Sequence, residues 1–156
     1  MSEFRFEKQR ISATLTLAPG TSVNGSFFVA LRTSTHEGTE RIGDLLNAQS
    51  GFFPFELRDG STVLYNRMHL VAVALEPGIS EAERDPGYDV ATHRHVGMLL
   101  STGMRVKGKV AVYAAPGRDR LSDYARAPQM FLYVITPKNT LIINATHIVE
   151  LTEIAD

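Results

Sequence analysis

The sequence predicts a mainly β fold of two tandem small barrels, each with five strands and one short helix between its second and third strands. Three observations indicate this fold: the chain repeats itself once, its apolar residues alternate over short segments, and glycines mark the turns and bends between those segments. The 156 residues are 44% hydrophobic and 21% charged. Such a chain buries enough apolar surface to offset the entropy of ordering, so we expect a globular protein.

The repeat consists of three pairs of segments that keep the same order along the chain. They are residues 17–25 with 100–108, residues 40–45 with 119–124, and residues 65–71 with 143–149. The first pair shares Leu, Gly, Val and Gly at the same spacing, and both members of the last pair contain Asn-x-x-His. A preserved order of this kind indicates a tandem duplication. Because each copy has about 60 to 70 residues, near the lower limit for independent stability, we expect the copies to pack on each other or on other subunits.

An acidic segment with two Pro-Gly pairs separates the copies. We expect a first barrel at residues 1–78, a linker at 79–91 and a second barrel at 92–156. Residues 79–92 contain four acids and one arginine, a net charge of −3, whereas residues 93–156 carry +3. The total charge of −1 therefore conceals a mildly basic second copy behind an acidic linker.

Strand-like apolar patterns and turn signals in the first copy predict five strands. They are expected at residues 11–17, 22–31, 53–57, 62–65 and 68–75. The Pro-Gly pair at 19–20 and the Asp-Gly pair at 59–60 predict tight turns after the first and third strands. Gly25 lies inside the second strand, where it predicts a bend.

The second copy repeats this pattern. Its strands are expected at residues 96–100, 104–114, 130–135, 141–143 and 147–151. A short helix is expected in each copy because apolar residues three and four apart lie between the second and third strands. These residues are Ile42, Leu45 and Leu46 in the first copy and Leu121, Tyr124 and Ala125 in the second. Five short, bent strands suit a small closed barrel, since closure removes exposed sheet edges.

Each copy carries two motifs at matching places. An apolar-x-x-Gly-x-x-Val-x-Gly motif lies at 17–25 and at 100–108, and a second motif lies on the turn between strands four and five, at 65–70 and 143–148. In both respects the chain resembles the Sm-like group of SH3-like barrels. The resemblance covers nearly all of both copies. It implies barrels that bind uridine at the second motif and that associate by pairing strand four of one barrel with strand five of the next.

The chain departs from the Sm-like pattern where that family binds RNA. The replaced positions are Asn66 and Asn144 for the family's arginine, and Arg67 and Ala145 for its glycine. The family's aromatic-Asp-x-x-Met-Asn loop corresponds to residues 30–35 and 113–118, which lack its Asp and Asn. We therefore expect RNA binding to be weak or absent.

The repeated Asn-x-x-His turns are candidate binding residues: Asn66 with His69, and Asn144 with His147. They could form a ring of donors and acceptors around a pore if several barrels assemble. The alternative, which we favour, is structural, because asparagine bonds the backbone of its own turn and a neighbouring histidine can bond strand carbonyls.

Two further polar groups have both a functional and a structural interpretation. His93 and His95 lie on one side of an extended segment, with Asp85 and Asp89 upstream, and could hold a divalent metal. The ligand set is incomplete, however, and polar segments entering a strand often contain histidine, so we expect no metal and no cofactor.

Arginine and aspartate also lie three residues apart on both predicted helices, as Arg41 with Asp44 and Arg120 with Asp123. Surface ion pairs are the simplest interpretation of this spacing. The sequence contains no nucleophile elbow, phosphate-binding loop, zinc-protease motif or dinucleotide fingerprint. We therefore expect a protein that is not an enzyme.

Three functions remain open. The first is a scaffold or interaction protein that assembles through its strand edges. The second is an RNA-binding protein that uses the basic second copy through Arg105, Lys107, Lys109, Arg118, Arg120 and Arg126, with Tyr113 for stacking. The third is a hydrolase or metal-dependent enzyme centred on His93 and His95.

Exposed strand edges predict self-assembly. Residues 62–65 and 141–143 are expected to be free edges, and neither contains a charge or a proline to protect it. We expect a closed homo-oligomer, preferably a trimer because three chains give a ring of six barrels, with a protein partner also possible. The lack of cysteine excludes disulfides and thiolate metal sites. Without a long apolar run or a signal peptide, a cytoplasmic protein that does not enter a membrane is expected.

Overall fold

The structure is a computed structural model and describes residues 8–31, 39–113, 120–126 and 128–154. The first copy forms β1 (Lys8–Leu17), β2 (Thr21–Ala30), α1 (Ile42–Asn47), β3 (Phe52–Leu57), β4 (Thr62–Asn66) and β5 (Leu70–Leu75). The second copy forms β6 (Thr92–Leu100), β7 (Arg105–Val112), α2 (Leu121–Tyr124), β8 (Phe131–Ile135), β9 (Thr140–Asn144) and β10 (Ile148–Glu153). All ten expected strands are present, and each short helix lies between the second and third strands of its copy.

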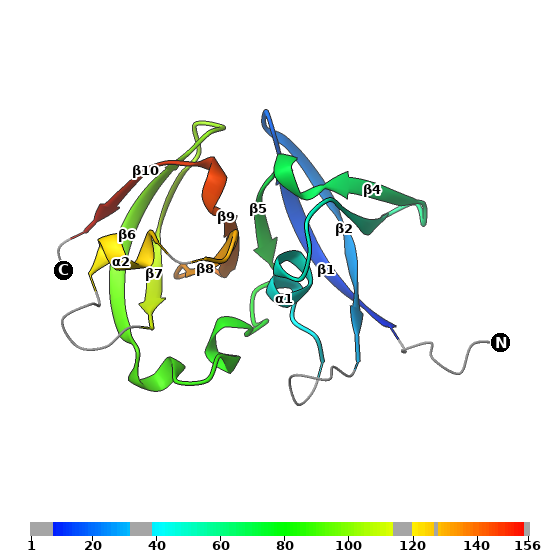
Figure 1. Ribbon diagram of the computed structural model, residues 1–156. Coiled ribbons are helices and arrows are strands. Elements are labelled where there is room, and N and C mark those ends of the chain that lie inside the picture. Colours follow the sequence, from blue (N-terminus) through cyan, green and yellow to red (C-terminus); the bar gives the residue numbers. More distant parts are fainter. Residues whose placement is uncertain (1–7, 32–38, 114–119, 127, 155–156) are drawn as a thin grey trace.

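The strands form one antiparallel sheet in the order β10-β6-β7-β8-β9-β5-β1-β2-β3-β4 (Figure 1). Each copy contributes five neighbouring strands with the same internal order, so β5 and β10 are equivalent, as are β4 and β9. The expected mainly β class is confirmed. The hydrogen-bonded sheet is, however, open and continuous through both copies, whereas the sequence predicted two separate five-stranded barrels.

Glycines allow the second strand of each copy to approach the third closely. A Cβ atom on Gly25 would lie 2.2 Å from the carbonyl oxygen of Glu56. At the equivalent Gly108, it would lie 2.7 Å from the carbonyl oxygen of Ile135. Any side chain at these two positions would force the strands apart, which explains why the repeat retains both glycines.

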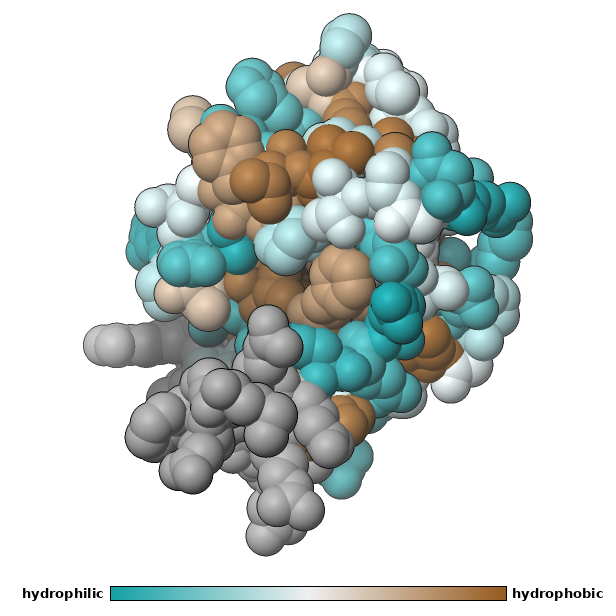
Figure 2. Space-filling view, turned by 90° about the vertical axis from the view of Figure 1, so that its right-hand side faces the viewer, coloured by the Kyte–Doolittle hydropathy of each residue, from teal (hydrophilic) through white to brown (hydrophobic). Residues whose placement is uncertain are grey.

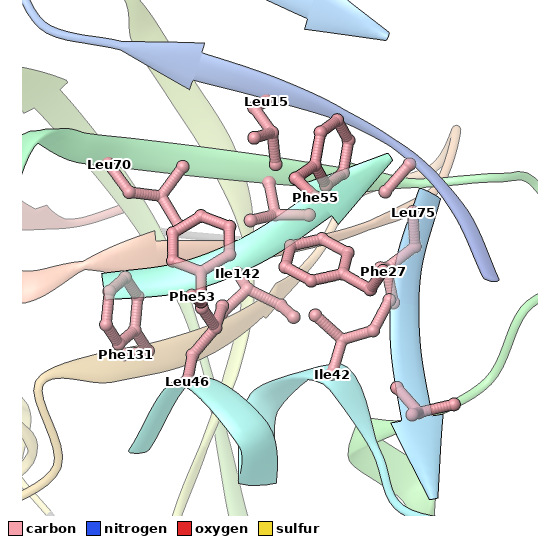
Figure 3. Close-up of a cluster of buried hydrophobic side chains, with 13 residues drawn as sticks. Leu15, Phe27, Ile42, Leu46, Phe53, Phe55, Leu70, Leu75, Phe131 and Ile142 are labelled. Atoms are coloured by element: carbon pink, nitrogen blue, oxygen red, sulfur yellow. The ribbon is translucent and has the colours of Figure 1, made fainter. Parts of the chain in front are cut away.

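Two clusters of buried side chains form the interior. The first core consists of Ala13, Leu15, Phe27, Val29, Ile42, Leu46, Phe53, Phe55, Leu70, Val73, Leu75, Phe131 and Ile142 (Figure 3). The second core consists of Val71, Ala72, Val96, Met98, Leu100, Val106, Val110, Val112, Tyr124, Val134 and Ile143. Each core includes two residues from the other copy. The two copies therefore share their interiors and do not merely touch.

The copies meet where β9 pairs with β5. Opposed pairs are Ala72↔Ile143, Val73↔Ile142 and Ala74↔Leu141. This corrects the expectation that residues 141–143 form a free edge, because β5 already covers them and Ile142 is fully buried. The two strands at the ends of the sheet are instead β4, as expected, and β10.

The linker is folded against both copies. It contains two 3₁₀ turns, η2 (Ala82–Arg84) and η3 (Tyr88–Val90), and buries the side chains of Glu81, Ala82 and Tyr88. No helix within the described ranges is long and apolar enough to cross a membrane.

Candidate assembly interface

The β9–β5 junction, with the turns and helix beside it, joins the copies through strand pairing, side-chain hydrogen bonds and buried apolar side chains. Its polar part is built from the Asn-x-x-His turns. In each turn the asparagine precedes a 3₁₀ turn, η1 (Arg67–His69) or η4 (Ala145–His147). The side-chain oxygens of Asn66 and Asn144 each accept a hydrogen bond, at 3.0 Å, from the backbone N–H two residues later. Both asparagines therefore have the turn-forming role that the sequence favours.

Asn144 and His147 also bind the turn of the first copy. The fully buried Asn144 amide donates to the carbonyl oxygens of Arg67 and Leu70, at 3.2 and 2.9 Å. Nε2 of His147 lies 2.7 Å from the carbonyl oxygen of Met68. A carbonyl only accepts, so Nε2 is the donor and carries the proton. The second-copy turn is thereby attached to three backbone carbonyl groups of the first-copy turn.

The apolar part of the junction exchanges side chains between the two cores. Phe131 from β8 and Ile142 from β9, 2% and 0% exposed, enter the first core beside Leu46 and Leu70 (Figure 3). In return, Val71 from β5 enters the second core. These exchanges bury apolar surface on both sides of the β9–β5 ladder.

The linker fastens the same junction at the N-terminus of α1. Glu81 is 2% exposed, and its carboxylate accepts hydrogen bonds from the backbone N–H of Ile42 at 2.9 Å and of Gly43 at 3.3 Å. The hydroxyl of Tyr133 on β8 donates to the same carboxylate at 2.8 Å. Burial first, and the negative charge of Glu81 second, raise the pKa of Tyr133 above its ordinary value, so the phenol remains a donor. One linker side chain thus ties α1 of the first copy to β8 of the second.

Arg41 belongs to this network and is not the expected surface ion pair. It is 8% exposed and contacts Asp44 at 2.8 Å and Asp85 of the linker at 2.6 Å. Its guanidinium carbon also lies 5.4 Å from the centre of the Tyr133 ring. Burial alone lowers the pKa of Arg41, but the hydrogen bonds to Asp44 and Asp85 and the charge interactions with Tyr133 and Asp44 raise it, so the guanidinium keeps its charge. In the second copy, Arg120 is exposed.

The matching surface of the first copy lies uncovered at the β4 end of the sheet. The register Phe52↔Asn66 repeats Phe131↔Asn144, so Phe52 and Leu64 occupy the positions of Phe131 and Ile142. Their exposures are 59% and 63%, against 2% and 0% at the junction. Figure 2 shows apolar side chains gathered on this face.

The opposite end of the sheet shows the reciprocal pattern. Val149 on β10 corresponds to Val71 on β5 in the repeat, yet Val149 is 65% exposed and Val71 is fully buried. Both ends of the sheet therefore expose apolar residues whose counterparts are buried where the two copies meet.

Of the other expected site residues, Tyr113 contacts the Arg41 network through Asp85. Arg105 and Lys107 are exposed on β7, and Arg118 lies outside the described residues. The Tyr113 hydroxyl donates to Asp85 at 3.1 Å. Burial, followed by the charge of Asp85, raises the pKa of Tyr113.

The structure does not bring the candidate metal ligands together. Nε2 of His93 lies 3.1 Å from the carbonyl oxygen of Tyr88, and the two carboxylate oxygens of Asp85 contact Arg41 and Tyr113. Within the described ranges, no group of three or more histidine or acidic side chains is arranged to hold a metal ion.

Sequence reasoning missed three residues: the buried Glu81 and Arg67 and the partly buried Tyr133. Arg67 is 2% exposed and donates to the carbonyl oxygens of Leu45, Leu46 and Phe52. The only sequence signal for it was its place in the Asn-x-x-His turn, where the other copy has alanine.

Comparison with known proteins supplies no relative, since no family model matches the chain and no curated protein or solved structure matches it significantly.

Proposed function

We propose that this protein is a non-enzymatic scaffold of two tandem Sm-like units that assembles with itself through strands β4 and β10. The observation that carries the proposal is the β9–β5 junction. It joins strand four of one copy to strand five of the other, and both partner surfaces recur, uncovered, at the ends of the sheet. At each end of the sheet, a neighbouring chain supplies the missing partner strand.

The apolar surface at the two ends gives assembly a driving force. Phe52, Leu64 and Val149 are 59%, 63% and 65% exposed. Burying each of them in a neighbouring core stabilises the assembly by about 1 to 2 kcal/mol. Pairing β4 with β10 also provides partners for the outward backbone groups of both edges, which otherwise invite uncontrolled strand pairing.

A contact between unlike ends joins chains head to tail and forms a closed ring when the rotation between chains permits. We propose a trimer, because three chains place six Sm-like units in one ring. The ring would contain two kinds of junction in alternation, one within each chain and one between neighbouring chains.

Light scattering tests this assembly. The wild-type protein is expected to have a mass three times the 17.2 kDa of one chain, and its ultraviolet spectrum shows whether nucleic acid accompanies it. Leu64→Glu is expected to give monomers, since it places a charge where an apolar side chain enters the neighbouring core.

Val90→Glu is the matched control for this experiment. Val90 is apolar and 89% exposed, but it lies in the linker and not on a strand edge. The same change of charge there is expected to leave the trimer intact. A wild-type chain that stays monomeric at high micromolar concentration would overturn the proposal.

A further inference from the structure

We infer that neighbouring chains join in one register, in which Leu64 lies opposite the partner's Leu151 and the turn at Asn66 and His69 binds the backbone of the partner's turn at 145–148. The inference rests on the proposed self-assembly and adds its atomic contacts. The β9–β5 junction within one chain serves as the template, because it joins two copies of the same repeat in the way that two neighbouring chains would join.

The repeat converts the internal register into an intermolecular one. In the repeat, Asn66 and Asn144 are 78 residues apart. To obtain the pairs between chains, each β9 residue is replaced by the β4 residue 78 positions earlier, and each β5 residue by the partner's β10 residue 78 positions later. Ala72↔Ile143, Val73↔Ile142 and Ala74↔Leu141 become Tyr65 opposite the partner's Glu150, Leu64 opposite the partner's Leu151, and Val63 opposite the partner's Thr152.

The backbone of β4 provides an independent check. Arg67 N–H donates to the carbonyl oxygen of Gly51 at 2.8 Å, which makes these two residues a hydrogen-bonded pair. Hydrogen-bonded and non-hydrogen-bonded pairs alternate along an antiparallel ladder, so Pro54↔Leu64 is a non-hydrogen-bonded pair. Proline has no N–H to donate, in agreement with this assignment. The N–H and C=O groups of Leu64 consequently point to the free edge.

The same reasoning applies to β10. Ile154 N–H donates to the carbonyl oxygen of His95 at 2.9 Å, and the alternation makes Leu151↔Met98 a non-hydrogen-bonded pair. The backbone groups of Leu151 therefore also point outward. In the inferred register the outward groups of Leu64 and the partner's Leu151 face each other, whereas a shift by one residue would oppose an outward group with an inward one.

The two Asn-x-x-His turns complete the contact. Asn144 donates to the carbonyls of Arg67 and Leu70, and His147 to that of Met68. The equivalent acceptors for Asn66 are the carbonyls of the partner's Ala145 and the partner's Ile148. For His69 the acceptor is the carbonyl of the partner's Thr146. This gives the exposed first-copy turn a binding role in addition to its structural one.

The two copies carry different residues at two equivalent positions, and these differences fit the inferred contact between chains. Tyr133 lies against Gly43 so closely that a Cβ atom on Gly43 would be 2.2 Å from the tyrosine oxygen. At the equivalent places, Pro54 replaces the tyrosine and Ser122 replaces the glycine. The smaller proline ring leaves room for the serine side chain of the partner, so the contact between chains needs no glycine on α2.

Engineered disulfides test the register, because the natural chain has no cysteine. Val63→Cys combined with Thr152→Cys places the two thiols in a non-hydrogen-bonded pair. The Cα atoms of such pairs are about 4.5 Å apart, within the range that a disulfide requires. Oxidation is expected to give covalent dimers and trimers on a non-reducing gel. Ala74→Cys with Leu141→Cys, the equivalent internal pair, should close within one chain and serves as the positive control.

Val63→Cys with Leu151→Cys is the negative control, since these side chains lie on opposite faces of the joined sheet. If the wild-type protein assembles but this shifted pair cross-links in preference to Val63 with Thr152, the register is wrong while the proposed scaffold stands. If the wild-type protein does not assemble, both are wrong.

Asn66→Asp tests the turn contact separately. Aspartate keeps the side-chain oxygen that accepts from Met68 N–H but loses the amide donor. Association is expected to weaken at least about tenfold, a change of roughly 1.4 kcal/mol, with unfolding of the dilute monomer unchanged. Unaltered association would show that the turn does not bind the partner.

Discussion

At the scale of single residues, the junction depends on buried polar groups that are nearly all paired. The Glu81 carboxylate receives three donors, and the Arg67 side chain binds three carbonyl groups. Among the described residues, the one buried side-chain polar atom without a hydrogen-bond partner is the hydroxyl of Tyr124 on α2. The buried Tyr124 and the partly buried Tyr133 therefore differ in whether their hydroxyls have a hydrogen-bond partner.

Removing the two hydroxyls should have different effects on stability. Tyr124→Phe deletes an unpaired polar atom and is expected to leave the free energy of unfolding unchanged or to raise it by up to about 1 kcal/mol. Tyr133→Phe removes a donor from the buried Glu81 carboxylate and is expected to lower it by about 1.5 to 3 kcal/mol. Urea unfolding at one fixed protein concentration measures both. Equal losses for the two variants would contradict this interpretation.

Gly43 is required by its contact with Tyr133 and not by its backbone. Gly43→Ala is expected to lower the free energy of unfolding by about 1 to 3 kcal/mol, the usual range for overpacking, although alanine favours helices. Combining it with Tyr133→Ala should make the second change cost less than it does alone, because the clash is then absent. Strict additivity in this double-mutant cycle would show that the two residues are uncoupled.

Residue roles were predictable from the sequence only where they are local. Asn66 and Asn144 hold their own turns through a bond that spans two residues, so the sequence motif was sufficient to assign it. Arg41 binds Asp85, 44 residues away, and no periodicity links two such positions. For that reason a pair expected at the surface proved to be part of a buried network.

At the scale of elements, β4 and β9 have the same place in the repeat but different environments. β4 is the last strand of the sheet, whereas β9 lies between β8 and β5. The Asp-Gly turn at 59–60 predicted β4, and the repeat of that pattern in the second copy predicted β9. Neither signal reports which edge of a strand is covered, since edge pairing uses backbone groups that every residue has. The assignment of residues 141–143 to a free edge was therefore wrong.

Proline substitutions distinguish the two strands. Ile142→Pro removes a donor from the middle of the sheet at a fully buried position, so we expect a loss of about 3 kcal/mol or more, or complete unfolding. Leu64→Pro lies on the edge, where the lost N–H points outward, and is expected to leave the fold intact while preventing assembly. Circular dichroism and light scattering separate these outcomes.

Val63→Pro is the matched control for Leu64→Pro. Its N–H points inward to β3 in the same ladder, so it should destabilise the fold itself. If Leu64→Pro unfolded the protein as Val63→Pro does, the outward direction of the Leu64 N–H would be wrong.

At the scale of the whole molecule, the charge distribution and the altered loop argue against a role in RNA binding. We expect no submicromolar binding of uridine-rich or adenine-rich oligonucleotides by fluorescence anisotropy at about 150 mM salt. The total charge is −1, and the Tyr113 hydroxyl is bonded to Asp85. Submicromolar binding that is abolished by Arg105→Ala, Lys107→Ala or Tyr113→Ala would show that the second copy binds RNA. RNA binding would then be favoured over the scaffold function.

The shared interior has a consequence for synthesis of the chain. The first core is complete only when Phe131 and Ile142 have joined it, yet the last strand of the first copy ends at Leu75. At roughly 5 to 20 residues per second, the ribosome needs about 3 to 14 s to add the intervening residues. Throughout that interval the nascent first copy leaves one edge of β5 free, the edge that β9 later covers. A folded neighbour with a free β4 edge could pair with this edge of β5. Correct folding therefore requires β9 of the same chain to pair with β5 before β4 of another chain does.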